Sequence, residues 1–155
     1  MTKPDHTLWH SPVITAWLAI LAVFCQSAFA EQKEVFDGFE VHYNAFSSTF
    51  LEPDVAKRYG IARSKAVGVV NITVLKTAEG SKPVPVAAQI EGLLNNSVQQ
   101  QRRLPFRRIT EGRAIYYIAE FQFVQSELLT FAITVYPEGG TQPLKLRFSQ
   151  NFYSD

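Results

Sequence analysis

Apolar and polar side chains alternate along much of the chain after residue 35. The clearest case is residues 114–123, where every second position is apolar and the positions between them include Glu120 and Gln122. This period of two is typical of a strand with one buried face, because successive strand side chains point to opposite sides of a sheet. We expect the core to receive one set of side chains from this segment: Ile115, Tyr117, Ala119, Phe121 and Phe123.

The same alternation predicts six further strands, separated by turn-forming residues. The expected strands cover residues 39–45, 70–74, 86–91, 106–110, 128–136 and 144–153. Glu111-Gly112, between two of them, is typical of a tight hairpin turn. Seven or eight short strands at this spacing predict an all-β fold. We expect an antiparallel β-sandwich of immunoglobulin-like type, with a small closed barrel as the alternative.

One short helix and one sequence motif complete the pattern. The helix is expected from Pro53 to Tyr59, because proline suits the first helical position, Asp54 favours the positive N-terminal end and Gly60 suits the C-terminal stop. The tripeptide Asn71-Ile72-Thr73 matches a glycosylation acceptor. Its position inside an expected strand favours a structural interpretation.

Residues 1–30 have the order of a secretory signal peptide. A polar start is followed by an apolar run from Val13 to Phe24 and by Ala28-Phe29-Ala30, which matches an A-x-A cleavage site. We expect cleavage after Ala30 and export from the cytoplasm, which leaves a single β-sandwich domain at residues 31–155. An uncleaved membrane anchor is the main alternative, because the apolar segment extended to Ala30 approaches the roughly 20 residues that span a bilayer.

Cleavage would remove several residue types on which enzymes and metal sites depend. The 125 residues that remain of the 155 have no cysteine and a single histidine, His42. A disulfide, a thiolate nucleophile and a histidine-rich metal site are therefore not expected, and we predict neither a metal nor a cofactor. The net charge of +1 does not indicate nucleic-acid binding.

Arginines are concentrated in the segment QRRLPFRRITEGR. Guanidinium groups bind phosphate and carboxylate through two parallel hydrogen bonds, so this cluster could hold an anionic glycan, a lipid headgroup or an acidic partner. The alternative is a solvated strand edge, whose charges prevent edge-to-edge pairing. Alternation also predicts that Arg107 and Arg108 point to opposite faces. The candidate binding residues here are Arg102, Arg103, Arg107, Arg108 and Arg113, together with Tyr116 on the less apolar face of its strand.

A polar row on the first expected strand is a second candidate site. Glu40, His42 and Asn44 share the outward face of that strand, and hydroxyl side chains follow at residues 47–49. A carboxylate beside an imidazole could orient a proton-transfer group. However, no Gly-x-Ser-x-Gly turn is present. We therefore assign no catalytic residue and keep His42 as a binding candidate, with ordinary polar surface as the alternative.

Three runs of the sequence resemble a known family. The run VHYNAFSSTFLEPDVAKRYGI, followed by RSKAVGVVNITVL and later by AIYYIAEFQF, is similar to secreted Gram-negative bacterial proteins of domain-of-unknown-function family 4426. The likeness covers essentially all of the chain after the signal segment, and the first run is its most specific part. The resemblance implies a periplasmic, all-β, single-domain protein with no assigned activity, and it assigns no site residues.

Two functions of different classes are compatible with these observations. The first is a non-enzymatic binding or interaction module of the periplasm, whose partner is an envelope protein or an anionic envelope component. The second is a small periplasmic hydrolase or transferase that uses Glu40, His42 and a nearby hydroxyl. In either case we expect no nucleic-acid partner, and membrane contact only through the signal segment if it is not cleaved.

Overall fold

The computed structural model describes residues 32–153 of the chain. Contacts divide the chain between Ala30 and Glu31, so every described residue belongs to the second unit. The predicted signal peptide at residues 1–30 lies outside the described residues, and its cleavage stays a prediction. Within residues 32–153, no helix is both long enough and apolar enough to cross a membrane.

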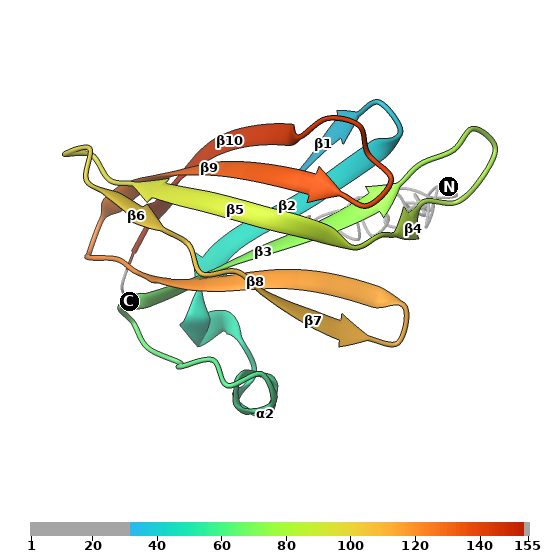
Figure 1. The fold of residues 1–155 in the computed structure, drawn as a ribbon. Helices are drawn as coiled ribbons and strands as arrows, with labels where there is room; N and C mark the ends of the chain where they lie inside the picture. Colours follow the sequence, from blue (N-terminus) through green and yellow to red (C-terminus); the bar gives the residue numbers. More distant parts are fainter. Residues whose placement is uncertain (1–31, 154–155) are drawn as a thin grey trace, which may run out of the picture. The chain divides into compact units, whose positions relative to one another are not determined.

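Six strands form one antiparallel sheet, which we call sheet A (Figure 1). Its spatial order is β1-β2-β3-β8-β7, and β4 pairs with the end of β3. Strand β3 is central because it pairs with β2 on one side and with β8 on the other. The strands in chain order are β1 (Gln32–Phe36), β2 (Phe39–Ser47), β3 (Val67–Lys76), β4 (Val84–Pro85), β7 (Arg107–Glu111) and β8 (Ala114–Gln122).

Four strands form a second antiparallel sheet, sheet B, which packs against one face of sheet A (Figure 1). Its spatial order is β10-β9-β5-β6. The long central strands β9 and β5 pair from Ala88 opposite Pro137 to Asn95 opposite Thr130. The strands in chain order are β5 (Ala88–Asn95), β6 (Gln101–Arg103), β9 (Glu127–Pro137) and β10 (Leu144–Phe152).

The core lies between the two sheets and contains the side chains that alternation assigns to it. Val41 and Ile72 of sheet A and Phe131 of sheet B are fully buried. In the segment 114–123, the predicted inward set is confirmed at four positions, whereas Ile115 is only partly buried at the margin of the core. The four buried residues of that set are Tyr117, Ala119, Phe121 and Phe123.

A row of stacked aromatic rings joins the sheets. Tyr43 of β2 stacks on Phe148 of β10 with ring centroids 4.6 Å apart, and Phe148 stacks on Phe131 of β9 at 4.7 Å. Phe121 meets Phe131 edge-on at 5.2 Å. Gly68 makes room for Phe121, because a Cβ atom at position 68 would lie 2.3 Å from its ring. The close approach of β3 to this ring therefore requires glycine.

The outer face of sheet A, which is turned away from sheet B, is partly covered by the connection between β2 and β3 (Figure 1). This connection contains a short 3-10 helix, η2 (Ser48–Phe50), and the helix α2 (Pro53–Arg58). Ala56 and Ile61 from this connection are buried against Val69 of β3 and form a second, smaller core. The outer face is thus apolar beneath α2.

The predicted helix is confirmed with a small change at its end. It begins at Pro53, has Asp54 in the first turn, and ends at Arg58. Tyr59 is the C-cap, so the helix is one residue shorter than expected. Gly60 follows with a φ of +61°, a left-handed conformation that glycine adopts without a steric penalty.

The predicted β-sandwich is confirmed, and the closed-barrel alternative is wrong because the strands form two separate sheets. The expected number of seven or eight strands is also wrong, since residues 32–153 form ten. The three additional strands are short and mostly exposed, and backbone pairing with a longer neighbour holds each of them. They are β1, β4 and β6, with five, two and three residues.

Candidate functional site

The five candidate arginines lie on the edges of two different sheets. Arg102 and Arg103 are on β6, at the edge of sheet B, whereas Arg107 and Arg108 are on β7, at the edge of sheet A. Arg113 lies in the turn between β7 and β8. The cluster in the sequence is therefore divided in space, and the structure does not form a single patch from all five residues.

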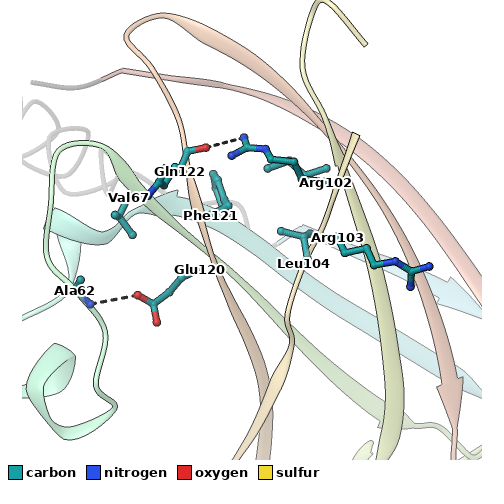
Figure 2. A pocket seen from close by; sticks show the side chains of 9 residues that line it. Ala62, Val67, Arg102, Arg103, Leu104, Glu120, Phe121 and Gln122 are labelled. Carbon is teal, nitrogen blue, oxygen red and sulfur yellow. Dashed lines mark hydrogen bonds between the residues drawn. The ribbon is translucent and has the colours of Figure 1, made fainter. Parts of the chain in front are cut away.

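A cleft of about 410 Å³ opens between the sheets where β6 approaches β8; we call it the edge cleft (Figure 2). Its base is apolar because Leu94, Leu104 and Phe121 belong to the core. Its rim carries ionised side chains, among them Arg102 and Glu120. The edge cleft can therefore receive a ligand that has both an apolar part and a charged group.

Arg102 spans the gap between the two sheets at the rim of the edge cleft. Its Nη2 atom donates a hydrogen bond to the backbone oxygen of Gln122 at 2.8 Å (Figure 2). A guanidinium has five N–H donors, so Arg102 retains donors for a ligand. The guanidinium of Arg103 points away from Arg102 in Figure 2 and borders a second hollow, on sheet B. The two arginines therefore do not act as one clamp.

Glu120 is the acidic residue of the edge cleft, and its carboxylate already has partners. Its Oε2 atom accepts a hydrogen bond from the backbone N–H of Ala62 at 3.2 Å. Its Oε1 atom lies 3.7 Å from Nη2 of Arg107. Because these groups compensate its charge, Glu120 opposes the field of Arg102 less than a free carboxylate would.

Arg107 and Arg108 have opposite orientations on β7, as strand alternation predicts. Nη2 of Arg107 donates a hydrogen bond to the backbone oxygen of Tyr59 at 2.6 Å, on the outer face beside α2. Arg108 pairs in register with Tyr117, whose side chain faces the core. Arg107 therefore has a structural role in fastening the C-terminal end of α2 to the sheet.

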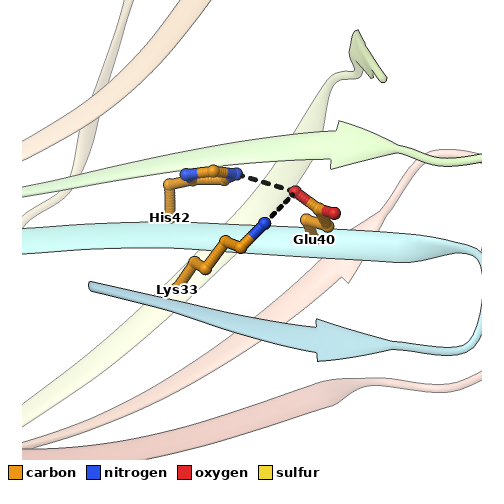
Figure 3. Close-up of polar contacts among 3 residues, drawn as sticks. All are labelled: Lys33, Glu40 and His42. Atoms are coloured by element: carbon orange, nitrogen blue, oxygen red, sulfur yellow. Dashed lines mark hydrogen bonds and ion pairs between the residues drawn. The ribbon is translucent and has the colours of Figure 1, made fainter. Parts of the chain in front are cut away.

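Glu40 and His42 form a polar cluster with Lys33 on the outer face of sheet A (Figure 3). Oε2 of Glu40 lies 3.1 Å from Nε2 of His42 and 3.3 Å from Nζ of Lys33. The hydrogen bond with His42, followed by the one with Lys33, lowers the pKa of Glu40 from its usual 4.5 despite some desolvation. Among residues 32–153, no three His, Cys, Asp or Glu side chains are grouped to hold a metal ion.

The hydroxyls at residues 47–49 do not complete this cluster. Ser47 lies five positions from His42 on β2, which is roughly 16 Å along the strand and on the opposite face. Oγ of Ser48 donates a hydrogen bond to the backbone oxygen of Ser64 at 3.2 Å and accepts one from its N–H at 2.9 Å. The carboxylate, imidazole and hydroxyl of the hydrolase hypothesis are therefore not brought together.

Tyr116 lies in a different hollow from the arginines. A cleft of about 190 Å³ lies between α2 and the outer face of sheet A, and we call it the helix cleft. Val55 and Tyr59 line it from the side of the helix, and Tyr116 and Ile118 line it from β8. Sequence reasoning placed Tyr116 on the correct face, but it did not predict that α2 would convert this face into a cleft.

Asn71 is a polar residue of this cleft that the sequence did not identify as a site residue. It lies on the central strand β3, and the atom Oδ1 is buried with no hydrogen-bond partner within residues 32–153. Strand alternation alone places Asn71 on the outer face. Its burial depends on the covering connection after β2, which the local pattern does not show.

A family model and a solved structure both relate this chain to the same family. The profile of a family described as "Domain of unknown function (DUF4426)" matches residues 33–155. The crystal structure of a DUF4426 family protein from Pseudomonas aeruginosa has 37% sequence identity and a TM-score of 0.69. The match covers 81% of this chain and 96% of that chain. No curated protein matches.

More distant structures share the fold. A copper-bound variant of FetP from uropathogenic Escherichia coli has 12% identity and a TM-score of 0.58, over 81% of this chain and 96% of that chain. FetP as isolated, recombinantly expressed in the periplasm of Escherichia coli, has 14% identity and a TM-score of 0.55, over 80% and 94% of the two chains. At this identity the likeness concerns the fold, and no copper ligand is transferred.

Proposed function

Because the chain belongs to the family DUF4426, a family of unknown function, we propose from its geometry that it is a non-enzymatic binding module of the periplasm. The proposed ligand is an extended, acidic and partly apolar segment of an envelope protein, bound in the edge cleft. One observation carries the proposal. An apolar base lies directly beside the Arg102 guanidinium, which keeps N–H donors after bonding to Gln122.

The end of β8 that extends beyond β7 favours an extended ligand. Pairing of β8 with β7 ends at Ile118, whereas its pairing with β3 continues to Gln122. Residues 119–122 therefore have no β7 neighbour, and beside the edge cleft the backbone oxygen of Gln122 is bonded to Arg102. Such an edge can accept an additional strand. Alternate side chains of the ligand would then meet the apolar base, and its carboxylates would meet Arg102.

The N-terminal sequence supports the proposed compartment. Residues 1–30 have the order of a signal peptide, which supports export. FetP, which has the same fold, has been expressed recombinantly in the periplasm. Sequencing the N-terminus of the protein from a periplasmic fraction tests this part of the proposal. We expect the chain to begin at Glu31, and a cytosolic protein that retains Met1 would contradict export.

The hydrolase alternative has weaker support. Glu40 and His42 are in contact, but Ser47 lies on the opposite face and Ser48 is bonded to Ser64. Proton transfer by a general base needs the reacting group within hydrogen-bond reach. The binding proposal needs no such constellation, so the geometry favours it.

The ligand proposal is tested with two peptides that differ only in charge. One peptide of about eight residues alternates valine with glutamate, and the other alternates valine with lysine. Each is titrated into isotope-labelled exported protein. We expect the acidic peptide to shift the amide signals of residues 119–122, because it adds to that edge. In Arg102→Gln, its affinity should fall about tenfold, the effect of losing one hydrogen bond to a charged group.

Arg113→Gln is the matched control, because it removes the same charge in the turn between β7 and β8. This variant should bind the acidic peptide as the wild type does. Equal affinity for both peptides, or an unchanged affinity in Arg102→Gln, would contradict the proposal. Cross-linking the protein in an envelope extract then distinguishes a protein partner from an anionic glycan or lipid.

A further inference from the structure

Strand β10 is the longest strand at an edge of either sheet in the described part of the chain. It has nine residues and pairs with β9 on one side only, whereas the edge strands β1, β6 and β7 have five, three and five residues. Its pairing with β9 is continuous from Leu144 to Phe152, without a bulge or a proline. Short strands, bulges and prolines are common protections of an edge, because unpaired backbone groups can join another strand. The length of β10 is therefore open to pairing.

Hydrogen-bond alternation identifies the backbone groups of β10 that point to the open edge. In β5, the backbone oxygen of Gly92 accepts a hydrogen bond from the N–H of Leu104, on the side away from β9. Successive residues of an antiparallel strand direct these groups to alternate sides. Leu93 therefore faces β9, and one register step further Phe131 of β9 faces its partner Phe148 of β10. The residues of β10 between such positions direct N–H and C=O to the open edge, and they are Lys145, Arg147, Ser149 and Asn151.

Side chains of β10 hold the strand in place against sheet A. Nε2 of Gln150 donates a hydrogen bond to the backbone oxygen of Ala45 at 2.8 Å, and the ring of Phe148 stacks on that of Tyr43. A strand that is already held in its extended form loses little conformational freedom when another strand pairs with it. The open edge is thus preorganised for pairing.

The charges of this edge lie in one half of the strand. Lys145 and Arg147 are basic and exposed, whereas Ser149 and Asn151 are neutral and exposed. Like charges directly opposite each other destabilise an antiparallel pair, so charged residues on an edge normally oppose pairing. A twofold axis reverses the strand direction, and it therefore places the charged half of one copy against the neutral half of the other. The charge pattern of β10 is complementary to itself.

We propose that β10 is a dimer interface, at which a second copy of this chain pairs antiparallel across a twofold axis at Phe148. Arg147 then lies opposite Ser149 of the partner subunit, and Lys145 lies opposite Asn151 of the partner subunit. The two four-stranded sheets become one continuous sheet. A shift that places Arg147 opposite Arg147 of the partner subunit is disfavoured by the like charges. The edge cleft lies beside β6, at the other edge of sheet B, so the dimer leaves it open and does not depend on the peptide-binding proposal.

Two charges at one position test the interface and its register. Sedimentation equilibrium of the exported protein, from about 1 to 500 μM at low salt, measures the dissociation constant of the dimer. Ser149→Arg places a second guanidinium opposite Arg147 of the partner subunit, and symmetry repeats this pair, so the constant should rise about tenfold. Ser149→Glu places a carboxylate there and should lower it about tenfold. Effects of opposite sign at one position distinguish pairing from a general loss of folding.

Gln101→Arg and Gln101→Glu are the matched controls, because Gln101 is exposed on β6, at the other edge of sheet B. Neither should change the dissociation constant. Ser149→Pro removes an N–H that the dimer uses, while an edge strand tolerates proline where its N–H faces solvent. This variant should be a monomer with the wild-type dichroism spectrum. A wild-type protein that stays monomeric at 500 μM, a dimer that persists in Ser149→Pro, or shifts of the same sign in Ser149→Arg and Ser149→Glu would overturn the proposal.

Discussion

The two faces of sheet A differ in physical character although the same strands supply both. On the inner face, Val41 and Ile72 are fully buried against sheet B. On the outer face, His42, Asn71 and Tyr116 are partly exposed and lie in a polar cluster or a cleft. The larger core therefore lies on one face, whereas the other face has a smaller core beneath α2 and, with the sheet edges, most of the groups capable of recognition.

The largest expected difference between the faces concerns stability. Ile72→Ala removes a fully buried side chain from the inner face and should lower the free energy of unfolding by about 2–5 kcal/mol. Thr73→Ala, at the next position and half-buried on the outer face, should lower it by less, about 1 kcal/mol. Urea denaturation measures both values. Similar losses in the two variants would show that the outer face contributes as much to stability as the inner face does.

A smaller effect of the opposite sign is expected at Asn71. Because its buried Oδ1 atom has no hydrogen-bond partner within residues 32–153, Asn71→Leu should leave the free energy of unfolding unchanged or raise it by about 1–2 kcal/mol. The exposed Asn44→Leu should stay within about 0.5 kcal/mol of the wild type. Urea denaturation in the absence of ligand makes the comparison. A loss of more than about 1 kcal/mol in Asn71→Leu would mean that the amide has a stabilising partner.

The smallest effect concerns pH at the polar cluster. The pKa of Glu40 is lowered by its hydrogen bonds to His42 and Lys33, so the carboxylate stabilises the folded protein in its ionised form. That contribution is present above the usual pKa of 4.5 and is lost as the pH falls through the lower folded-state value. Glu40→Gln should therefore be less stable than the wild type at pH 7, and the difference should become smaller as the pH falls below 4.5. Thermal unfolding over this pH range checks this, and a constant difference would contradict it.

The long strands could be predicted because their pattern is local. Alternation in residues 114–123 and 128–136 identifies β8 and β9 and the residues that they bury. The strands β1, β4 and β6 could not be predicted in this way, because each is short and is defined by pairing with a longer neighbour. Register and pairing are non-local properties, and a single sequence does not display them.

The candidate sites could likewise be predicted only where they depend on local alternation along a strand. Alternation correctly separates Arg107 from Arg108, and it also places Ser47 on the face opposite His42, which was a reason against the hydrolase hypothesis in the sequence itself. In contrast, the bond from Arg102 to Gln122 joins residues on different sheets, and the cleft beside Asn71 depends on a helix that packs on its strand. These arrangements arise from tertiary packing.

The ring stack from Tyr43 to Phe148 gives this protein an internal optical reporter. Both tryptophans, Trp9 and Trp17, lie within residues 1–30. After cleavage, intrinsic fluorescence would come mainly from tyrosine, and Tyr43 stacks on a ring of the opposite sheet. Near-ultraviolet dichroism of the exported protein should therefore follow the separation of the sheets without an added label.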